Sequence, residues 1–311
     1  MTWALCLAAA RAEDVAVVLS SGASPYRQAA VELEARLRKL GHAPRTALLA
    51  DLRNRGGLAD RADAAYVGVG TSAAAWLCRN APAGARMAYC MVSDPNQAGL
   101  LKRPNTGGVC LHVPLTAQFR LIAEALPRAQ VVGMLYRAKT HEGPKLVNKI
   151  TAALPKGWRL EAVVVEKHHS MAKAIEAILS RKVDVIWTCP DSSVYDVATV
   201  RSLLLTGIRR NVPVFGFSRA FVRAGALLGV GIDPRTQGRQ AAEAMHRLLV
   251  QATTKPSAEA ANSPARRRHH ADPEYIIAAN LIVAKKLSIE LPAGLTGRAD
   301  CIFRQKGASR E

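Results

Sequence analysis

Short apolar runs and longer stretches with helical spacing alternate along this chain. Residues 14–19 form a β-rich apolar run that is typical of a buried strand. Residues 25–40 repeat apolar side chains along one helical face, and Gly41 then provides a suitable end for that helix. The same alternation predicts further strands at 45–49, 64–70, 87–92, 108–112, 131–136, 160–165, 183–187, 212–215, 226–230 and 274–278. It predicts further helices from 73 onward and over 114–126, 145–153, 171–179, 194–206, 238–250 and 281–287.

Strands that alternate with helices predict an α/β protein whose parallel sheets carry helices on both faces. The pattern restarts near residue 113, because the apolar run 131–136 mirrors the first strand. We therefore expect two Rossmann-like lobes joined by a hinge. Their expected bounds are 13–112 for lobe 1 (with part of the C-terminal segment), 113–230 for lobe 2, and 231–303 for a C-terminal segment that crosses the hinge. The expected surface segments are a polar, mobile loop at 51–57, a linker rich in Ala, Ser, Pro and Arg at 253–273, and a frayed tail at 304–311.

Two of the expected strands end in a turn rich in helix-capping residues. Asp191, Ser192 and Ser193 follow one strand, and Thr71 and Ser72 follow the other. A side-chain oxygen at such a place accepts a hydrogen bond from the first helical turn. The positive end of the helix then points at the space beyond the strand, which is a place to hold an anion or a polar small molecule. The alternative is that both turns are ordinary, well-capped connections without a ligand.

Ligands of parallel α/β sheets lie beyond the carboxyl ends of the strands. The loops expected there supply the candidate ligand-binding residues, which are Ser20, Ser21, Gly70, Thr71, Ser72, Asp94, Asp191, Ser192, Ser193, Phe217 and Ser218. We expect an anionic group of the solute at Thr71 and Ser72, and its polar end at the turn 191–193. Asp94 and Asp191 would repel an anion but suit an ammonium group, so the two signs together favour an amino-acid-like zwitterion.

Two of these assignments have explicit alternatives. Both aspartates could simply cap turns, because a carboxylate near the start of a turn accepts from the backbone. Phe217 is the first choice for an apolar wall of the binding site, since an aromatic ring buries a large apolar area. Tyr89 and Tyr195 are instead expected in the core or on the surface.

Two motifs suggest an enzyme. The run 68–73 fits G-x-G-x-x-A after a strand, and Asp94 lies about twenty residues on, as in a dinucleotide fingerprint. An NAD(P)-dependent oxidoreductase is therefore the alternative function, although this unit is not the first βαβ unit and the second lobe offers no catalytic set. The run 216–220 nearly matches a nucleophile elbow, but it would need an acid and a downstream histidine, and His246 lies within a predicted helix.

The sequence predicts neither a cofactor nor a metal site. The histidine pairs 168–169 and 269–270 are adjacent in sequence, and neighbours in sequence do not share a helix face. Six cysteines, at 6, 78, 90, 110, 189 and 301, show no metal-binding spacing. Cys78, Cys90, Cys110 and Cys189 are expected as small core residues, and one disulfide remains open.

Lys and Arg number 43 against 24 Asp and Glu, which gives a formal net charge of +19. The basic residues are spread along the chain, with modest clusters at 36–39 and 266–270, and no DNA-binding motif accompanies them. A solvated basic surface is therefore favoured over a nucleic-acid partner. The apolar fraction of 49% suffices for full cores, and no run of ~18 apolar residues exists that could span a membrane.

The N-terminus resembles an export signal. Residues 2–10 form a short apolar run, and Ala10-Arg11-Ala12 fits a small-x-small cleavage site before Glu13. We therefore expect residues 1–12 to be a signal peptide remnant, although the usual basic start is missing. The alternative is an N-terminal extension of a cytoplasmic protein.

The order of short motifs over residues 14–303 resembles the ABC-transporter substrate-binding proteins of the TrpX-like group, which have a type I periplasmic-binding fold. The motifs are Gly70-Thr71-Ser72, Ser93-Asp94-Pro95, Gly108-Val109 with Gln118-Phe119, 132–136, Pro190-Asp191-Ser192, 213–218, Gly225-Ala226, 238–242 and 280–284. The resemblance implies a non-enzymatic, monomeric periplasmic receptor. Such a receptor closes two lobes over a small solute, like a Venus flytrap, and presents it to an ABC permease in the inner membrane. Some relatives take up aromatic amino acids.

Overall fold

The computed structural model describes residues 13–58, 65–139, 143–253 and 268–305. The expected signal peptide and most of the expected linker lie outside these ranges. The chain divides into two compact units, here called unit 1 and unit 2. Unit 1 comprises the chain up to His112 together with Ile232–Glu274, and unit 2 comprises Val113–Gly231 together with the chain from Tyr275.

The described part of unit 1 is built on a six-stranded sheet with every neighbouring pair parallel, in the order β11-β5-β4-β3-β1-β2. Its elements are β1 (Asp14–Leu19), α1 (Ser24–Lys39), β2 (Ala43–Leu48), α2 (Leu49–Asn54), β3 (Ala65–Val69), α3 (Thr71–Asn80), β4 (Arg86–Val92), η1 (Leu100–Lys102), β5 (Thr106–Cys110), α9 (Pro234–Thr253) and β11 (Arg268–Ala271).

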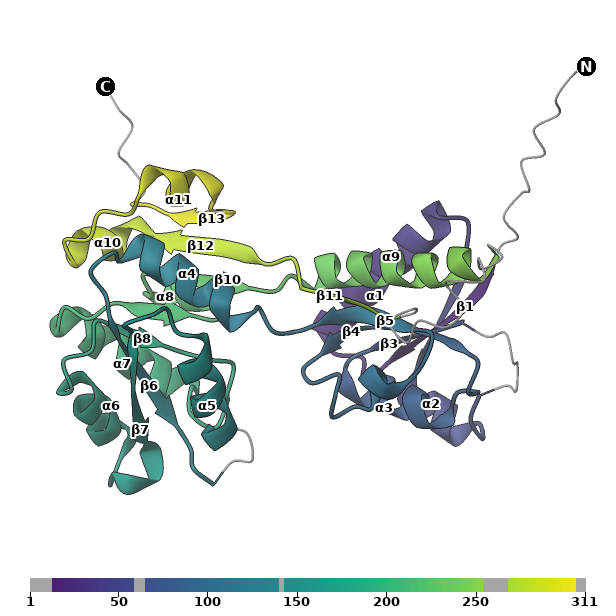
Figure 1. The fold of residues 1–311 in the computed structure, drawn as a ribbon, viewed down its shortest axis with the longest axis horizontal. Helices are drawn as coiled ribbons and strands as arrows, with labels where there is room; N and C mark the ends of the chain where they lie inside the picture. The colour runs from purple at the N-terminus through teal and green to yellow at the C-terminus, as the bar shows by residue number, and fades with distance from the viewer. Residues whose placement is uncertain (1–12, 59–64, 140–142, 254–267, 306–311) are drawn as a thin grey trace, which may run out of the picture. The chain divides into compact units, whose positions relative to one another are not determined.

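Helices cover both faces of the unit 1 sheet (Figure 1). One face packs against α1 and α9, which contribute Leu33 and Met245 to the core, and the other packs against α3 through Leu77. The α1 and α9 backbones approach closely at Gly238, where an added Cβ would lie 2.0 Å from the carbonyl oxygen of Ala29. Alternate strand residues face the two layers, so the near-continuous apolar runs of the sequence follow from burial on both sides.

The described part of unit 2 is built on a seven-stranded sheet in the order β13-β12-β10-β9-β8-β6-β7. Its elements are α4 (Leu115–Ala125), β6 (Val131–Tyr136), α5 (Gly143–Ala153), β7 (Arg159–Val164), η2 (Val165–Lys167), α6 (Met171–Leu179), β8 (Val185–Trp187), α7 (Val197–Arg209), β9 (Val214–Gly216), α8 (Arg219–Ala224), β10 (Leu228–Gly231), β12 (Ile276–Asn280), α10 (Leu281–Lys286), α11 (Ala293–Arg298) and β13 (Cys301–Phe303).

Unit 2 departs from the expected all-parallel sheet at one pair of strands. β10 and β12 are antiparallel, whereas the other neighbouring pairs of described strands are parallel. One face of the sheet packs against α6, α7 and α8, with Ile178 and Leu203 in the core. On the other face, Phe119 of α4 lies 6.2 Å from the ring of Trp187, whose Nε1 donates to Oε1 of the buried Gln118 at 2.9 Å. The predicted α/β class with two parallel-dominated sheets is confirmed.

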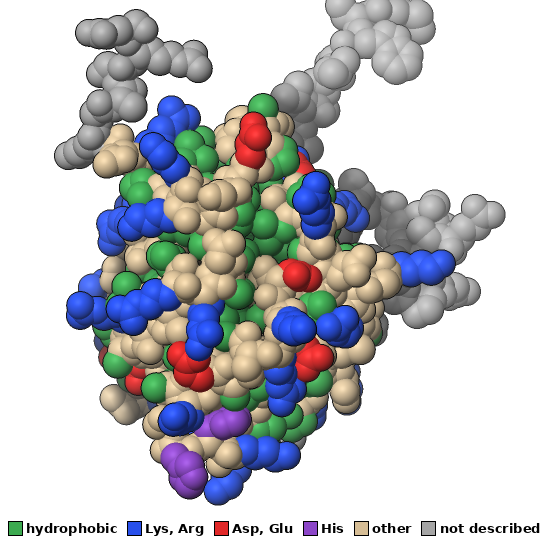
Figure 2. Space-filling model, turned by 90° about the vertical axis from the view of Figure 1, so that its left-hand side faces the viewer, with side chains coloured by type: hydrophobic (Ala, Val, Ile, Leu, Met, Phe, Trp, Pro, Cys, Tyr) green, Lys and Arg blue, Asp and Glu red, His purple; other side chains and the backbone are tan. Residues whose placement is uncertain are grey.

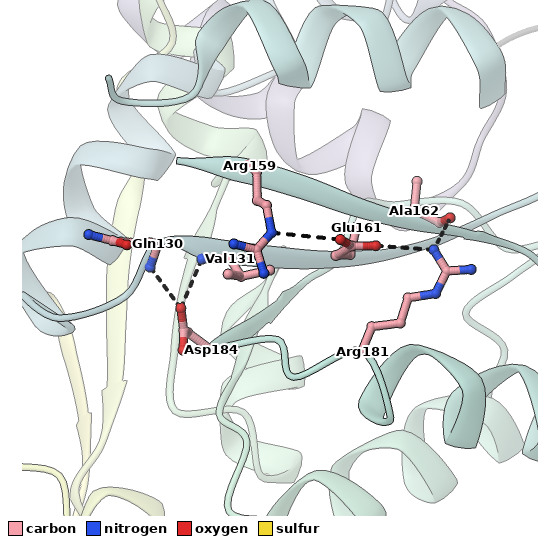
Figure 3. Close-up of polar contacts among 7 residues, drawn as sticks. All are labelled: Gln130, Val131, Arg159, Glu161, Ala162, Arg181 and Asp184. Atoms are coloured by element: carbon pink, nitrogen blue, oxygen red, sulfur yellow. Dashed lines mark hydrogen bonds and ion pairs between the residues drawn. The ribbon is translucent and has the colours of Figure 1, made fainter. Parts of the chain in front are cut away.

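Charged side chains stabilise the edge of unit 2 at β6 and β7 (Figure 3). Asp184 accepts from the backbone N–H groups of Gln130 and Val131, both at 2.8 Å, so it caps the start of β6. Glu161 on β7 lies 3.1 Å from Arg181 and 3.7 Å from Arg159. Because β7 is an edge strand, these charges also disfavour pairing with another chain.

Two segments that the sequence pattern predicted as irregular contain regular structure. Part of the expected mobile loop belongs to α2, and the expected linker includes β11, which pairs with β5 in register. The C-terminal region also contains α11 and β13, and neither was predicted. Edge strands such as β11 and β13 receive their hydrogen bonds from a neighbouring strand, so their own residues need little β propensity.

The described residues contain no helix long and apolar enough to cross a membrane. Their five cysteines are free thiols, of which Cys90 is buried as expected. Cys78, Cys110 and Cys189 are only partly buried. Lys and Arg side chains are dispersed over the face drawn in Figure 2 and do not gather in one patch.

Candidate functional site

In unit 1, the serine that follows β1 bonds both the end of β3 and the first turn of α3. Ser20 follows β1, and its Oγ accepts a hydrogen bond from the backbone N–H of Ala73 in the first turn of α3, at 2.9 Å. The backbone N–H of Ser20 donates to Val69 at the end of β3. The N-cap of α3 is Gly70, whose φ is 94°. Glycine has no side chain that could cap the helix. The prediction that Thr71 and Ser72 cap this helix is therefore wrong, because Ser20 supplies that bond from another strand.

Thr71 instead links α3 to the end of β4. Its Oγ1 accepts from the backbone N–H of Ser93 at 3.3 Å and lies 3.2 Å from the Ser93 hydroxyl. Ser72 and Ser21 are exposed beside this group. Unit 1 thus brings together the expected residues Ser20, Gly70 and Thr71, and it adds Ser93 as a further hydroxyl at the same strand edge.

The sequence pattern did not single out the aromatic ring at this edge. An added Cβ at Gly70 would lie 2.8 Å from the ring of Tyr26 and 2.5 Å from Oγ of Ser20. Tyr26 lies in the first turn of α1 and is partly buried against the core. Its position just after the first strand end was the available signal, because the loops at such ends line ligand sites.

Asp94 and Asp191 both cap turns, as the alternative assignment held. Oδ1 of Asp94 accepts from the backbone N–H groups of Asn96 and Gln97, each at 2.9 Å. Oδ1 of Asp191 accepts from the backbone N–H of Ser193 at 2.9 Å and from its hydroxyl at 2.6 Å. In each case the capping bonds are made by Oδ1.

The turn 191–193 does not begin the following helix. α7 begins at Val197, and its N-cap is Asp196, which accepts from the N–H of Thr199 at 2.7 Å. Hydrogen bonds from Thr199 lower the pKa of Asp196. Between the turn and the helix, Val194 and Tyr195 are buried in the core. The prediction of a helix start at Asp191, Ser192 or Ser193 is therefore wrong, because tertiary packing holds 194–195 out of the helix.

A cation that the sequence pattern did not single out lies beside this turn. Arg137 follows β6 directly, and its Nε donates to the backbone oxygen of Ser193 at 2.7 Å. Arg137 therefore occupies in unit 2 the place that Ser20 occupies in unit 1, immediately after the first parallel strand. A basic residue directly after a strand end was the available signal.

Aromatic rings lie at the neighbouring strand end of unit 2. The ring of Phe217 is partly buried, 5.0 Å from the ring of Phe221 and 6.3 Å from that of Tyr195. Ser218 caps α8 by accepting from the N–H of Phe221 at 3.1 Å. Tyr195 and Tyr89 are both buried in the core, which is one of the two placements expected for them.

Burial also suppresses ionisation near this edge. It raises the pKa of the Cys189 thiol to about 12, with the Asp191 charge adding to the effect. It raises the pKa of Tyr195 well above its ordinary value, and the Tyr195 hydroxyl donates to the Leu135 carbonyl at 3.3 Å. At neutral pH these groups are therefore a neutral thiol and a neutral phenol. The charged side chains at this edge include Arg137, Asp191 and Glu166, which accepts from the Ala138 N–H at 3.2 Å.

The glycines of the G-x-G-x-x-A run have structural explanations in unit 1. An added Cβ at Gly68 would lie 2.6 Å from Cα of Ala74, so Gly68 permits close packing of strand and helix. The space at Gly70, where a pyrophosphate would approach the backbone, holds Ser20 and Tyr26. The arrangement therefore does not favour a dinucleotide here.

The other enzyme motif also lacks support. Ser218 is used as the cap of α8, and His246 is bonded to His42 at 2.9 Å. No group of three or more potential ligands that could hold a metal ion occurs in the part of the chain that the structure describes.

Solved structures show the fold to which this architecture belongs. A conserved domain protein from Vibrio cholerae is 20% identical, with a TM-score of 0.62. An ABC domain in complex with L-Trp from Streptococcus pneumoniae is 20% identical, with a TM-score of 0.61. A ligand-free, open substrate binding protein with adhesive properties from Clostridium difficile is 15% identical, with a TM-score of 0.70. Each match covers 94% of this chain and 100% of the other.

The family model of the ABC transporter substrate binding proteins matches residues 58–300. Because the match spans most of the sequence, the chain belongs to this family, and the resemblance to the TrpX-like group is confirmed at that level. No curated protein matches the chain at a significant level.

Proposed function

We propose that this chain is the solute-binding component of an ABC importer and that its solute is a small, amino-acid-like zwitterion. Family membership supports the first part. The chemistry of Arg137 and Asp191 supports the second and is the observation that carries it. Both side chains are bonded to Ser193, so a cation and a carboxylate are held at the same turn. A zwitterion carries two opposite charges that match this pair, whereas a neutral sugar carries none.

In this proposal, residues of both units contact the solute. The hydroxyl groups of Thr71, Ser72 and Ser93 in unit 1 bind its carboxylate, because hydroxyl groups and a helix N-terminus favour an anion. Asp191 in unit 2 binds its ammonium group, Arg137 at the same turn adds an attraction for its carboxylate, and Ser192 and Ser193 add hydrogen bonds. Ser20, Ser21, Gly70 and Asp94 shape the unit 1 edge, as Ser218 does next to Phe217.

Hydrogen bonds alone do not account for micromolar affinity for the solute. Each hydrogen bond to a charged group contributes about 1.5–3 kcal/mol. Two or three give roughly 5 kcal/mol, whereas a micromolar complex needs about 8 kcal/mol net of the cost of association. Apolar burial must supply the difference, and Phe217 and Tyr26 are the rings proposed for it. An aromatic amino acid fits this requirement, in keeping with the L-Trp complex of the Streptococcus pneumoniae relative.

The remaining assignments concern the cell. We propose that the protein is exported to the periplasm, that cleavage exposes Glu13, and that the mature protein is a monomer that delivers its solute to an ABC permease. N-terminal sequencing of protein recovered from the periplasm tests the export. Recovery from the cytosol with Met1 intact would contradict it.

A thermal-shift screen followed by isothermal titration tests the solute class. The parent protein is screened against amino acids, small carboxylates, neutral sugars and NADH. We expect amino acids to raise the melting temperature, because a ligand that binds only the folded state stabilises it. Tight binding of sugars alone would refute the zwitterion, and NADH binding without any solute would favour the oxidoreductase class.

Substitutions then locate the binding residues. Ser72→Ala, Asp191→Ala and Phe217→Ala should each weaken binding of the identified solute by about tenfold or more, the equivalent of one contact of ~1.4 kcal/mol. Val197→Ala, at an exposed side chain of unit 2, is the control and should bind like the parent. Parent-like affinity in all three test variants would show that the solute is bound elsewhere.

A further inference from the structure

One fully buried side chain of unit 1 joins the ends of two strands. Gln237 lies in the first turn of α9, and none of its surface is exposed. Its Oε1 accepts from the backbone N–H of Met91 at 3.0 Å, and its Nε2 donates to the backbone oxygen of Cys110 at 3.0 Å. Burying an amide is costly unless its polar atoms are bonded, and here both ends are bonded.

Gln237 meets β4 where the pairing of β4 with β5 is interrupted. The register runs regularly to Tyr89 opposite Gly108 and resumes at Val92 opposite Cys110. Two residues of β4 therefore stand opposite one of β5, which is a bulge. Met91 within this bulge has φ of 57°, a conformation that a non-glycine residue keeps only when its surroundings impose it.

The bulge determines the path of the last residues of β4, which lead to the candidate binding residues of unit 1. Ser93 follows Met91 by two residues, and its N–H and hydroxyl both meet Thr71. A continuous series of contacts thus runs from Gln237 through Met91 to Ser93 and Thr71. Sequence periodicity cannot reveal it, because Gln237 and Met91 are 146 residues apart.

We propose that Gln237 is a positioning residue for the binding edge of unit 1, because its amide holds the β4 bulge in the shape that directs Ser93 toward Thr71. The effect on solute affinity rests on the proposed function. The effect on the bulge stands independently of it.

The chain offers a matched control one turn further along α9. Gln240 has the same side chain, and its Nε2 donates to the backbone oxygen of Asp272 while its Oε1 accepts from the N–H of Glu274, both at 3.1 Å. These partners lie at the end of the second segment of unit 1, not on β4. Gln240 therefore has the same kind of two-point contact without a direct connection to Met91.

Residue-resolved amide hydrogen exchange on the full chain, without any solute, tests the effect on the bulge. Methionine has nearly the shape of glutamine but no amide, so the variants are Gln237→Met and Gln240→Met. Gln237→Met should raise exchange at Met91 and Ser93 by about tenfold or more, as expected for loss of one buried hydrogen bond. Gln240→Met should leave these amides unchanged and raise exchange at Glu274. Equal effects of the two variants at Met91 and Ser93 would overturn the proposal.

The variant Gln237→Glu distinguishes loss of the Oε1 acceptor from a general loosening of the core. A glutamate keeps an oxygen for the Met91 N–H, whether it is ionised or protonated. Met91 and Ser93 should therefore exchange more slowly in Gln237→Glu than in Gln237→Met, even where both variants melt at the same lowered temperature. Identical exchange in these two variants would refute the role of the Oε1 atom.

Titration with L-tryptophan, and with whichever solute the screen identifies, tests the consequence for affinity. We expect Kd to rise about tenfold in Gln237→Met and to stay within about twofold of the parent in Gln240→Met. Parent-like Kd in Gln237→Met would overturn the link to binding. If the parent itself binds nothing, the proposed function fails, while the exchange measurements still decide the positioning role.

Discussion

The two units present different chemistry at corresponding strand ends. In unit 1, the residue after the first strand is Ser20, and its hydroxyl is used within the fold to bond α3. In unit 2, the residue after the first strand is Arg137, and its guanidinium donates a hydrogen bond to the turn 191–193. Unit 1 thus offers mainly hydroxyl groups, together with the carboxylate of Asp94, and unit 2 offers a cation and a carboxylate beside aromatic rings. One α/β architecture supports both, because the loops, not the sheet, carry the chemistry.

The units also differ in how a helix start is satisfied. In unit 2, Asn280 caps its own helix α10 through its Oδ1, which accepts from the N–H groups of Ile282 and Val283. In unit 1, α3 starts at a glycine and receives its bond from Ser20. A local cap depends on neighbouring residues only, whereas the Ser20 cap requires the sheet to be assembled first.

The largest expected effect concerns the close helix pair of unit 1. Gly238→Val should lower the free energy of unfolding of unit 1 by about 3 kcal/mol, because the added carbons meet the Ala29 carbonyl and the helices must separate. Gly294→Ala in α11 of unit 2 is the control, since no heavy atom lies within 4 Å of its added Cβ. It should leave stability unchanged or raise it by about 0.5–1 kcal/mol. Chemical denaturation followed by hydrogen exchange resolves the two units, and equal losses would contradict the packing argument.

The next effect tests the local cap of unit 2. Asn280 is buried, and its Nδ2 also donates to the Val222 carbonyl at 2.8 Å. Asn280→Ala should destabilise unit 2 by about 2–3 kcal/mol, since three hydrogen bonds are lost around a buried site. Asn280→Asp keeps the two capping bonds and loses the donor, so its melting temperature should fall between those of Asn280→Ala and the parent. A thermal melt of both variants checks this order.

A smaller effect contrasts Ser20 with Arg137 directly. Ser20→Ala should cost unit 1 about 1 kcal/mol of stability, because it leaves the Ala73 N–H without its capping partner. Arg137→Met should change the stability of unit 2 by no more than about 0.5 kcal/mol, as is usual for a partly exposed side chain. It should nevertheless weaken binding of a zwitterionic solute about tenfold, the equivalent of ~1.4 kcal/mol. Denaturation and calorimetric titration of both variants measure the two effects. A loss of stability in Arg137→Met with unchanged affinity would show that Arg137 serves the fold and not the solute.

The smallest expected effect is a pH dependence confined to unit 1. Burial lowers the pKa of His42 below its ordinary value of 6.5, the charge of His246 lowers it further, and Glu13 acts in the opposite direction. The folded state therefore favours neutral His42, whereas the unfolded chain takes up a proton near pH 6.5. The stability contributed by this difference is fully present above pH 6.5 and is lost as the pH falls from there toward the lower pKa of the folded state.

Two variants check the origin of this pH dependence. His42→Gln can still bond His246 but does not titrate, so its unit 1 stability should vary less between pH 8 and pH 5 than that of the parent. His169→Gln removes an exposed histidine from unit 2 and serves as the control. An unchanged slope in His42→Gln would assign the dependence to other groups.

The sequence predicted most of the elements that position the candidate site. Apolar runs such as 14–19 and 131–136 coincide with β1 and β6, because a strand buried on both faces must be apolar along its whole length. The spacing of apolar residues likewise predicted 171–179 as a helix with the bounds of α6. These features are local and are encoded within a few consecutive residues.

The sequence alone determined the α/β class, the strand ends that carry Ser20, Gly70, Asp94, Asp191 and Ser218, and membership of the substrate-binding family. Only the tertiary structure decided which groups those residues meet. In the folded chain, Ser20 caps α3 and Asp196 is the N-cap of α7. β11 pairs with β5, and Gln237 bonds the backbone of Met91. The physical reason is that each of these contacts joins residues distant in sequence or depends on burial of a neighbouring segment. Hydrophobic periodicity reports which face of an element is buried, but not which distant polar group will satisfy its backbone.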